Sequence, residues 1–308
     1  MPLLRFVIGR LAMIPLIVLG VVTVLFLIFQ AVPGDAATMM AGATATQAEI
    51  NAIRMQLGLD RPLPVQYIGQ LAALLHGNFG YSPTFHGNPL PYILARVPAT
   101  LLLTGTAIGL AILVGIPAGV AAAAMQGRWP DLTISGGVVA FLAVPNFWLG
   151  LLMISLLSVQ LRWLPSFGLH GPLSLIMPSL ALAARLIAIV ARMTRGLVIE
   201  EMRRDYVRTA RAKGLDLRRV LWRHVLRNAL VPTITAIGLE AGYLLGGSVV
   251  IERLFAWPGI GDLLLNAIGN RDYTLVQGVT VLFVIGFLLI NLVVELLYVL
   301  VNPRLRHA

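Results

Sequence analysis

The feature that most constrains this chain is a series of long apolar runs. The run at residues 11–31 has no charged residue over 21 positions, enough for a helix rising 1.5 Å per residue to cross about 30 Å of hydrocarbon. Charged residues make up only 12% of the chain, about half the share of a soluble domain. The pattern predicts an all-α polytopic membrane protein. Five further apolar runs complete six predicted transmembrane helices, at 99–125, 132–158, 175–194, 230–251 and 279–301.

The distribution of arginine predicts the orientation of these helices. Arg5 and Arg10 precede the first run, which is too long for the apolar region of a cleaved signal peptide, so we expect an uncleaved signal anchor. Six spans place both termini on one side, and the basic residues concentrate on that side, above all in residues 195–229. The positive-inside rule therefore predicts cytoplasmic N and C termini. It also explains the net charge of +10 without a nucleic-acid partner.

Residues suited to catalysis or metal binding are scarce. The chain has no cysteine, and its five histidines show none of the spacings of a zinc site. No nucleophile motif is present. We therefore expect no metal, no cofactor and no catalytic residue. Proline inside three of the spans, at Pro117, Pro145 and Pro178, predicts kinked helices.

Residues 32–98 are too long for a simple connection and predict a small helical periplasmic insertion. Thr46 and Glu49 have the spacing of a capping box, so a helix should begin there and end near Gly58. Its apolar stripe would comprise Ile50, Ile53 and Leu57. A second helix is predicted at 65–75, after Pro64 and before Gly77.

The other outward segment, residues 252–278, is predicted to be re-entrant or interfacial. Trp257, Pro258 and Gly259 indicate a tight turn, and Asp262 is expected to cap a short helix at 263–268. The turn could form a periplasmic gate or docking site. The alternative is a tryptophan anchored at the membrane surface.

Residues 195–229, here called the elbow, carry ten basic and four acidic residues. A helix is predicted at 205–213, with Gly214 as a left-handed stop and Asp216 as the N-cap of a second helix. Four apolar residues share one face of that second helix: Leu217, Val220, Leu221 and Val225. We expect this apolar ridge to lie in a groove of another protein.

The elbow resembles the coupling loop of ABC importer permeases. The likeness lies in Tyr206-Val207-Arg208-Thr209-Ala210-Arg211-Ala212-Lys213-Gly214-Leu215 and in His224-Val225-Leu226-Arg227-Asn228-Ala229-Leu230-Val231-Pro232. The broad family has Glu-Ala-Ala-x-x-x-Gly, then Ile-x-Leu-Pro. Here Ala210, Gly214 and Leu226 match, whereas Arg208 and Thr209 replace the first two residues, and His224 and Arg227 replace the later Ile and Pro. This variant is similar to the dipeptide/oligopeptide branch, which includes nickel and glutathione importers.

Other segments extend the resemblance over nearly the whole chain, in the family's order. They are residues 32–35 (Val-Pro-Gly-Asp), 56–63 (Gln-Leu-Gly-Leu-Asp-Arg-Pro-Leu), 77–82 (Gly-Asn-Phe-Gly-Tyr-Ser) and 255–261 (Phe-Ala-Trp-Pro-Gly-Ile-Gly).

The resemblance implies a type I ABC importer permease in the bacterial inner membrane, working by alternating access. Its partners would be a second homologous permease, usually a different chain, two ABC ATP-binding subunits, and a periplasmic or lipid-anchored substrate-binding protein. ATP and Mg²⁺ would bind the partner subunits, because the single lysine, Lys213, rules out a P-loop in this chain. Ala210 and Gly214 would be small because the elbow fits a tight cleft. The implied coupling residues are Tyr206, Arg208, Thr209, Ala210, Arg211, Ala212, Lys213, Gly214, Leu215, His224 and Arg227.

Two ionisable residues at membrane depth, Arg185 and Glu240, are expected to pair or to line an aqueous path, because an isolated charge there is costly. An ion-coupled secondary transporter is the rival class, but it should show inverted repeats or more midplane charges than these two and Glu295. The cargo expected is di- or oligopeptides, with glutathione or a nickel chelate as alternatives. The predicted regions are 1–31, 32–98, a permease core at 99–301 and a cytoplasmic tail at 302–308.

Overall fold

The computed structural model describes residues 2–31, 36–41, 45–56 and 58–301. The Val-Pro-Gly-Asp segment at 32–35, Leu57 and the tail at 302–308 lie outside the described residues. The described part is helical throughout, apart from loops and one isolated bridge between Ser82 and Gly87. The helices are α1 Pro2–Ala31, α2 Ala36–Ala41, α3 Gln47–Gln56, α4 Leu63–Leu75, α5 Leu90–Leu110, α6 Ile116–Ala124, α7 Trp129–Ala143, α8 Asn146–Met153, α9 Ile176–Met202, α10 Asp205–Ala212, α11 Leu217–Val220, α12 Leu226–Leu254, α13 Ile260–Gly269 and α14 Tyr273–Val301. Short π segments η1 Ala111–Gly115, η2 Ile154–Gln160 and η4 Leu221–Val225, and a 3₁₀ turn η3 Pro172–Leu175, join some of them.

Five helical stretches are long and apolar enough to cross a membrane: 7–31, 90–124, 172–202, 232–254 and 273–296. The span predicted at 132–158 is sharply bent at its proline, because α7 and the α8–η2 helix meet there at 102°. Val144 is extended (φ −88°, ψ 124°) immediately before Pro145, the conformation that a following proline imposes. The described residues therefore hold five spans, or six if the bent pair counts as one.

The other two prolines behave differently. Pro117 follows the π segment η1, and the helix continues through it from Leu90 to Ala124. A π turn before a proline accommodates the missing N–H without breaking the helix. Pro178 is the third residue of α9, in the first turn, where a missing N–H costs least. It does not kink the span as expected.

Helix α9 is the centre of the bundle and packs against α5, α6, α7, α8 and α12. Its Leu182, Leu186 and Val190 are fully buried. Glycine allows α6 to approach closely, because a Cβ on Gly119 would lie 2.5 Å from the carbonyl oxygen of Ala191. By contrast, α1 lies at the periphery, where it packs along α14. The apolar exterior of such helices suits a lipid environment.

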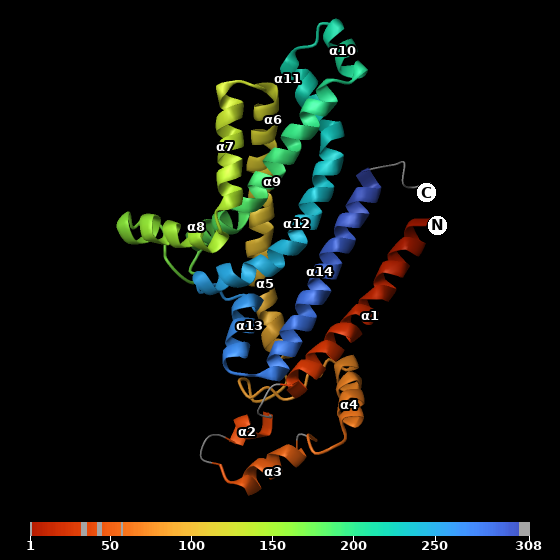
Figure 1. Cartoon of the computed structure of the whole chain (residues 1–308), viewed down its shortest axis with the longest axis vertical. Coiled ribbons are helices and arrows are strands. Elements are labelled where there is room, and N and C mark those ends of the chain that lie inside the picture. The colour runs from red at the N-terminus through yellow and green to blue at the C-terminus, as the bar shows by residue number, and fades with distance from the viewer. Residues whose placement is uncertain (1, 32–35, 42–44, 57, 302–308) are drawn as a thin grey trace.

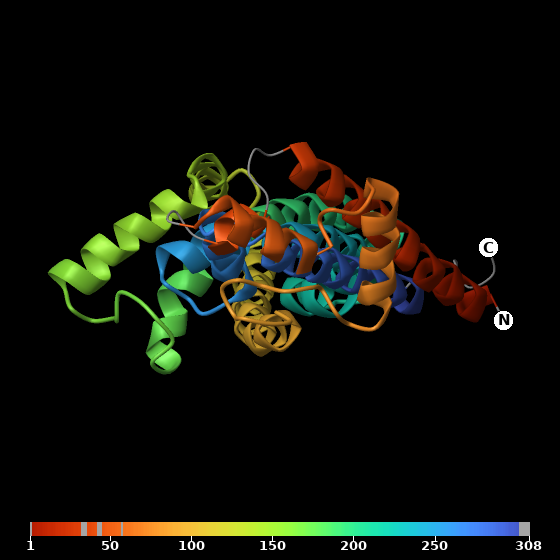
Figure 2. The ribbon, with the colours of Figure 1, turned by 90° about the horizontal axis from the view of Figure 1, so that it is seen from below.

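The insertion and the elbow lie at opposite ends of the molecule (Figure 1). The capping box is present: Glu49 Oε2 accepts the Thr46 N–H at 2.7 Å, and the Thr46 hydroxyl accepts the Glu49 N–H at 3.4 Å. Gly58 has the left-handed φ of +69°. The second helix, α4, begins two residues earlier than predicted, with Pro64 in its first turn. Figure 2 shows α2–α4 lying across this end of the bundle.

The insertion is fastened to the bundle by polar contacts. The hydroxyls of Thr23 in α1 and Tyr67 in α4 lie 2.6 Å apart, and the buried Asp272 accepts the hydroxyl of Ser82 at 2.5 Å. Asp272 also accepts the N–H of Leu275 in the first turn of α14. The 77–82 segment is thereby fixed to the start of the last helix through Ser82, its one buried residue.

Candidate functional site

The elbow is a helix-turn-helix, as the sequence predicts. Gly214 has φ +78°, its N–H bonds the Arg211 carbonyl at 2.9 Å, and Leu215 N–H reaches the Ala210 carbonyl at 3.3 Å. This left-handed stop ends α10. The Asp216 carboxylate accepts the Arg218 N–H at 3.3 Å and caps α11. From there α11, η4 and α12 run on without a break to Leu254.

The predicted apolar ridge does not face outward. Val220, Leu221 and Val225 are buried against Val198 and Val207 of the same chain, and only Leu217 of the four is exposed. The expectation of a ridge for another protein is therefore wrong. An amphipathic helix buries its apolar face wherever a matching face lies nearest, and here the end of α9 supplies it.

The outward face of the elbow is polar and basic instead. Ala210 is buried in the elbow's own core, and Leu215 and His224 are half-buried. Ala210 is thus small for packing within this chain, and Gly214 is required by its φ rather than by crowding, since a Cβ there would meet nothing within 4 Å. The predicted coupling residues that are exposed are Tyr206, Arg208, Thr209, Arg211, Ala212, Lys213, Gly214 and Arg227.

Tyr206 links the two arms of the elbow. Its hydroxyl donates to Glu201 Oε2 at 2.6 Å and accepts from the Asn228 side chain at 3.1 Å. Burial, with a smaller effect from the hydrogen bond to Glu201, raises the pKa of Tyr206 above its ordinary value. The phenol is therefore held neutral, as a bridge from the end of α9 to the start of α12.

A second link at this end was missed by sequence reasoning. The Arg195 guanidinium donates two hydrogen bonds to the buried Asp131 carboxylate, at 2.6 and 2.8 Å. Asp131 also accepts the Gly127 N–H at 2.9 Å. The pair ties the start of α7 to the first residue of the elbow, which lies in α9. One signal was available, because Asp131 is the only acidic residue between Asp60 and Glu200.

At the opposite end, in the segment at 252–278, Trp257 is not exposed as a docking residue or a surface anchor would be. The indole is fully buried, and its N–H donates to the Ala99 carbonyl at 2.9 Å. It is therefore neither a surface anchor nor an exposed docking residue. The Trp257, Pro258 and Gly259 turn packs into the bundle between α5 and α12.

Asp262 does not cap α13, which begins at Ile260 after Gly259. Glu252 of α12 does so instead: its Oε2 accepts the N–H groups of Gly261 and Asp262, at 2.7 and 3.1 Å. A carboxylate at this point satisfies amides that lack an intrahelical acceptor. Asp262 instead pairs with Arg253 at 3.1 Å.

Arg185 and Glu240 are not brought together. Arg185 lines a pocket at the α7–α8 break, beside Gly247 of α12. Glu240 lies seven residues before Gly247 in α12, about 10 Å away at 1.5 Å per residue. Within the part of the chain that the structure describes, neither side chain forms an ion pair. Among those same residues, no three potential metal ligands lie together.

A bundle of membrane-length apolar helices, with a basic elbow at one end and a folded insertion at the other, is the architecture of a polytopic membrane transport permease. The chain belongs to the binding-protein-dependent transport system inner membrane component family. That family's model matches residues 115–307, and the model of its N-terminal part matches 3–104. The protein is accordingly a multi-pass bacterial inner-membrane protein and an ABC importer permease subunit.

Relatives match over their full length. The glutathione transport system permease protein GsiC of Salmonella choleraesuis (strain SC-B67) is 41% identical over 306 residues, covering 99% of this chain and 100% of the relative. GsiC of Escherichia coli (strain K12) is 42% identical over 307 residues, with the same coverage.

Among solved structures, an inward-facing form of the MetNI methionine ABC transporter matches with a TM-score of 0.58 and 23% identity, over 68% of this chain and 96% of that chain. A second inward-facing MetNI crystal form gives a TM-score of 0.59 at 23% identity, over 70% of this chain and 98% of that chain. The likeness supports the type I importer permease fold.

Proposed function

We propose that this subunit forms, with a second permease, the path by which a small peptide-class solute is imported at the expense of ATP hydrolysed by separate subunits. The observation that carries the proposal is the elbow, whose apolar residues are buried within the chain while its basic face is exposed. Such a face suits an acidic or polar cleft of another protein. A substrate-binding protein would act at the opposite end, where the insertion lies.

The connections of the elbow support a mechanical role. It continues without interruption into α12, whose 29 residues extend about 43 Å at 1.5 Å per residue. The far end of α12 carries Glu252, bonded to α5 and α13. A displacement of the elbow by an ATP-binding subunit would move a helix that reaches both ends of the bundle, as rigid-body alternating access requires.

Glutathione is the first cargo to test, because the permeases GsiC of two bacteria are similar over their whole length. Glutathione is itself a tripeptide, so di- and oligopeptides remain the second candidates. The basic elbow does not distinguish these solutes, since it lies far from the insertion end.

The test is charge reversal on the elbow in the complete importer, reconstituted with its partner subunits in liposomes. Arg208→Glu combined with Arg211→Glu should abolish copurification of the ATP-binding subunits and uptake of glutathione or dipeptide. Arg61→Glu combined with Arg162→Glu, an equal charge change on two exposed arginines outside the elbow, is the matched control and should leave both intact. Undiminished ATP-driven uptake by the elbow variant would overturn the proposal.

A further inference from the structure

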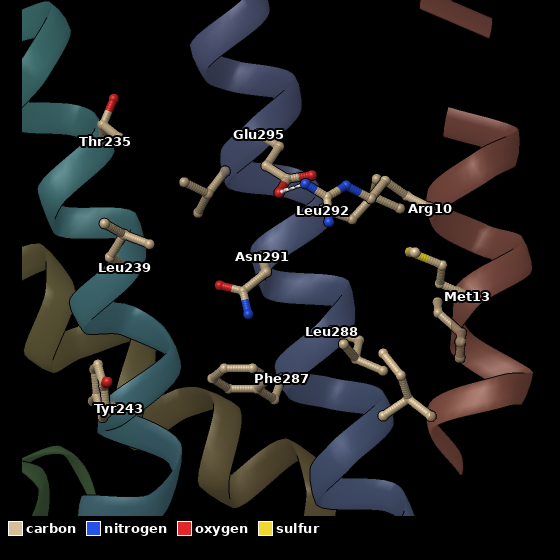
Figure 3. Close-up of a pocket in the computed structure, with 13 residues that line it drawn as sticks. Arg10, Met13, Thr235, Leu239, Tyr243, Phe287, Leu288, Asn291, Leu292 and Glu295 are labelled. Atoms are coloured by element: carbon tan, nitrogen blue, oxygen red, sulfur yellow. Dashed lines mark ion pairs between the residues drawn. The ribbon is translucent and has the colours of Figure 1, made fainter. Parts of the chain in front are cut away.

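A groove with a volume of about 490 Å³ lies between α1, α12 and α14 (Figure 3). Its floor is α14, and its walls are α1 on one side and α12 on the other. All three are apolar helices of membrane-crossing length. Small-molecule sites commonly have volumes of this size.

The groove is more polar than its membrane position requires. Among the residues that line it are Thr235 and Tyr243 of α12, Asn291 and Glu295 of α14, and Arg10 of α1. Polar side chains at membrane depth are costly, and they usually face a water-filled cavity or a ligand path. Arg10, Thr235 and Glu295 lie in the terminal turns of their spans, and the other eight lining residues are apolar. Tyr243 and Asn291, deeper in their spans, are therefore the two side chains that favour water or a solute over hydrocarbon in the groove.

Two of these side chains lack a partner inside the protein. Among the described residues, neither the Asn291 amide nor the Tyr243 hydroxyl makes a hydrogen bond. Tyr243 is 75% exposed, and Figure 3 shows Asn291 pointing from α14 toward α12, across the groove. A carboxamide both donates and accepts, so it complements a peptide group.

A charged pair closes one end of the groove. Arg10 and Glu295 form an ion pair of 2.5 Å that joins α1 to α14. Both side chains remain partly exposed. Because the two charges cancel, this end has no net attraction for an anionic lipid head group. It does offer a cation to a carboxylate and an anion to an ammonium group.

We propose that this groove is a transient binding site for the transported solute, a zwitterion with amide groups such as a short peptide. Asn291 and Tyr243 hydrogen-bond its amides, and the Arg10–Glu295 pair accommodates its charged ends. The assignment rests on the proposed function. A lipid acyl chain fits the groove less well, because it would leave the Asn291 amide without a partner.

The absence of cysteine from the chain makes a direct test possible. Asn291→Cys and Tyr243→Cys are made singly, and Val293→Cys serves as the control, since Val293 is an exposed apolar residue two positions along α14 and hence on another face. The complete importer in proteoliposomes is treated with a charged, water-soluble methanethiosulfonate. The solutes are Ala-Ala and S-methylglutathione, neither of which has a free thiol.

We expect both groove cysteines to react at least about tenfold faster than the control, because a thiol in lipid does not ionise. Either solute should slow the reaction of the groove cysteines severalfold. In a separate variant, Asn291→Leu should raise the KM for uptake and leave the amount of bound ATP-binding subunit unchanged. Groove cysteines as inert as Val293→Cys would show a lipid or a protein partner there and overturn the proposal. Reaction that neither solute slows would also overturn it. Both outcomes differ from failure of the proposed function, in which the unmodified complex itself shows no ATP-driven uptake.

Discussion

The hydroxyl of Thr100 in α5 donates a hydrogen bond of 2.7 Å to Oε1 of Glu252 in α12, and both residues are buried. The same hydroxyl oxygen accepts the Ile260 N–H at 2.9 Å. One threonine therefore connects α5, the end of α12 and the start of α13.

Thr100→Val keeps the shape of the side chain and removes its hydroxyl. We expect the free energy of unfolding to fall by about 1–3 kcal/mol, because a buried carboxylate oxygen and a buried amide both lose a partner. Thermal unfolding of the purified complex measures this. Thr280→Val is the control, since the Thr280 hydroxyl bonds only a carbonyl of its own helix. Equal losses in the two variants would contradict the assignment.

The Asp131–Arg195 pair leads to a second prediction, at the elbow end. Asp131→Asn and Arg195→Gln should each lower the Tm by several degrees, because each leaves a buried or half-buried charge without its partner. The Tm of Arg195→Lys should lie between those of Arg195→Gln and the wild type, since an ammonium cannot form the paired bonds of a guanidinium. The double variant Asp131→Asn with Arg195→Gln should lower the Tm by less than the sum of the two single effects, as a double-mutant cycle would measure. Strict additivity would show that the pair contributes little.

Gly214 is predicted to tolerate asparagine but not valine. A β-branched residue at φ +78° should destabilise the turn by about 1–2 kcal/mol, whereas asparagine adopts the left-handed conformation readily. ATP-driven uptake by the reconstituted importer should fall for Gly214→Val and be largely kept for Gly214→Asn. Because space around Gly214 is open within this chain, loss of uptake with Gly214→Asn in a normally folded subunit would instead indicate a tight contact with a partner.

Tyr206 should make the stability of the elbow depend on pH in the alkaline range. Its folded-state pKa lies above the ordinary value of 10.0, so the stabilisation by the neutral phenol is fully present below about pH 10 and is lost as the pH rises through the folded pKa. Tyr206→Phe should remove this dependence and cost up to about 1 kcal/mol at neutral pH. The absorbance of tyrosinate at about 295 nm reports the titration. The difference between the wild type and Tyr206→Phe isolates the contribution of Tyr206. An unshifted titration would contradict the hydrogen-bonded, partly desolvated state of the hydroxyl.

Pro145 is predicted to cause the 102° break between α7 and α8. Pro145→Ala removes the restraint on Val144 and should allow a straighter helix pair. Spin labels at Leu132 and Val159, both exposed, should move apart in the alanine variant, as measured by pulsed electron resonance. An unchanged distance would show that packing of α8 against α9 and α12, rather than proline, holds the bend.

Much of the fold could be predicted from the sequence because its signals are local. Apolar runs gave the helices, the Thr46 and Glu49 spacing gave the start of α3, and Gly214 with Asp216 gave the two ends of the elbow turn. Each depends on residues within a few positions of one another, where backbone geometry and capping dominate. The break at Pro145 belongs to the same class, since a proline acts on its immediate neighbour.

The residues that hold the ends of the bundle are different. Asp131 meets Arg195 across 64 positions and Thr100 meets Glu252 across 152, and no local pattern pairs them. The sequence by itself determined which segments are helical, which are apolar and where the elbow turns. Only the tertiary structure decided that the elbow's apolar ridge faces inward and that Trp257 is buried, because the face a helix buries depends on which other helix is packed beside it.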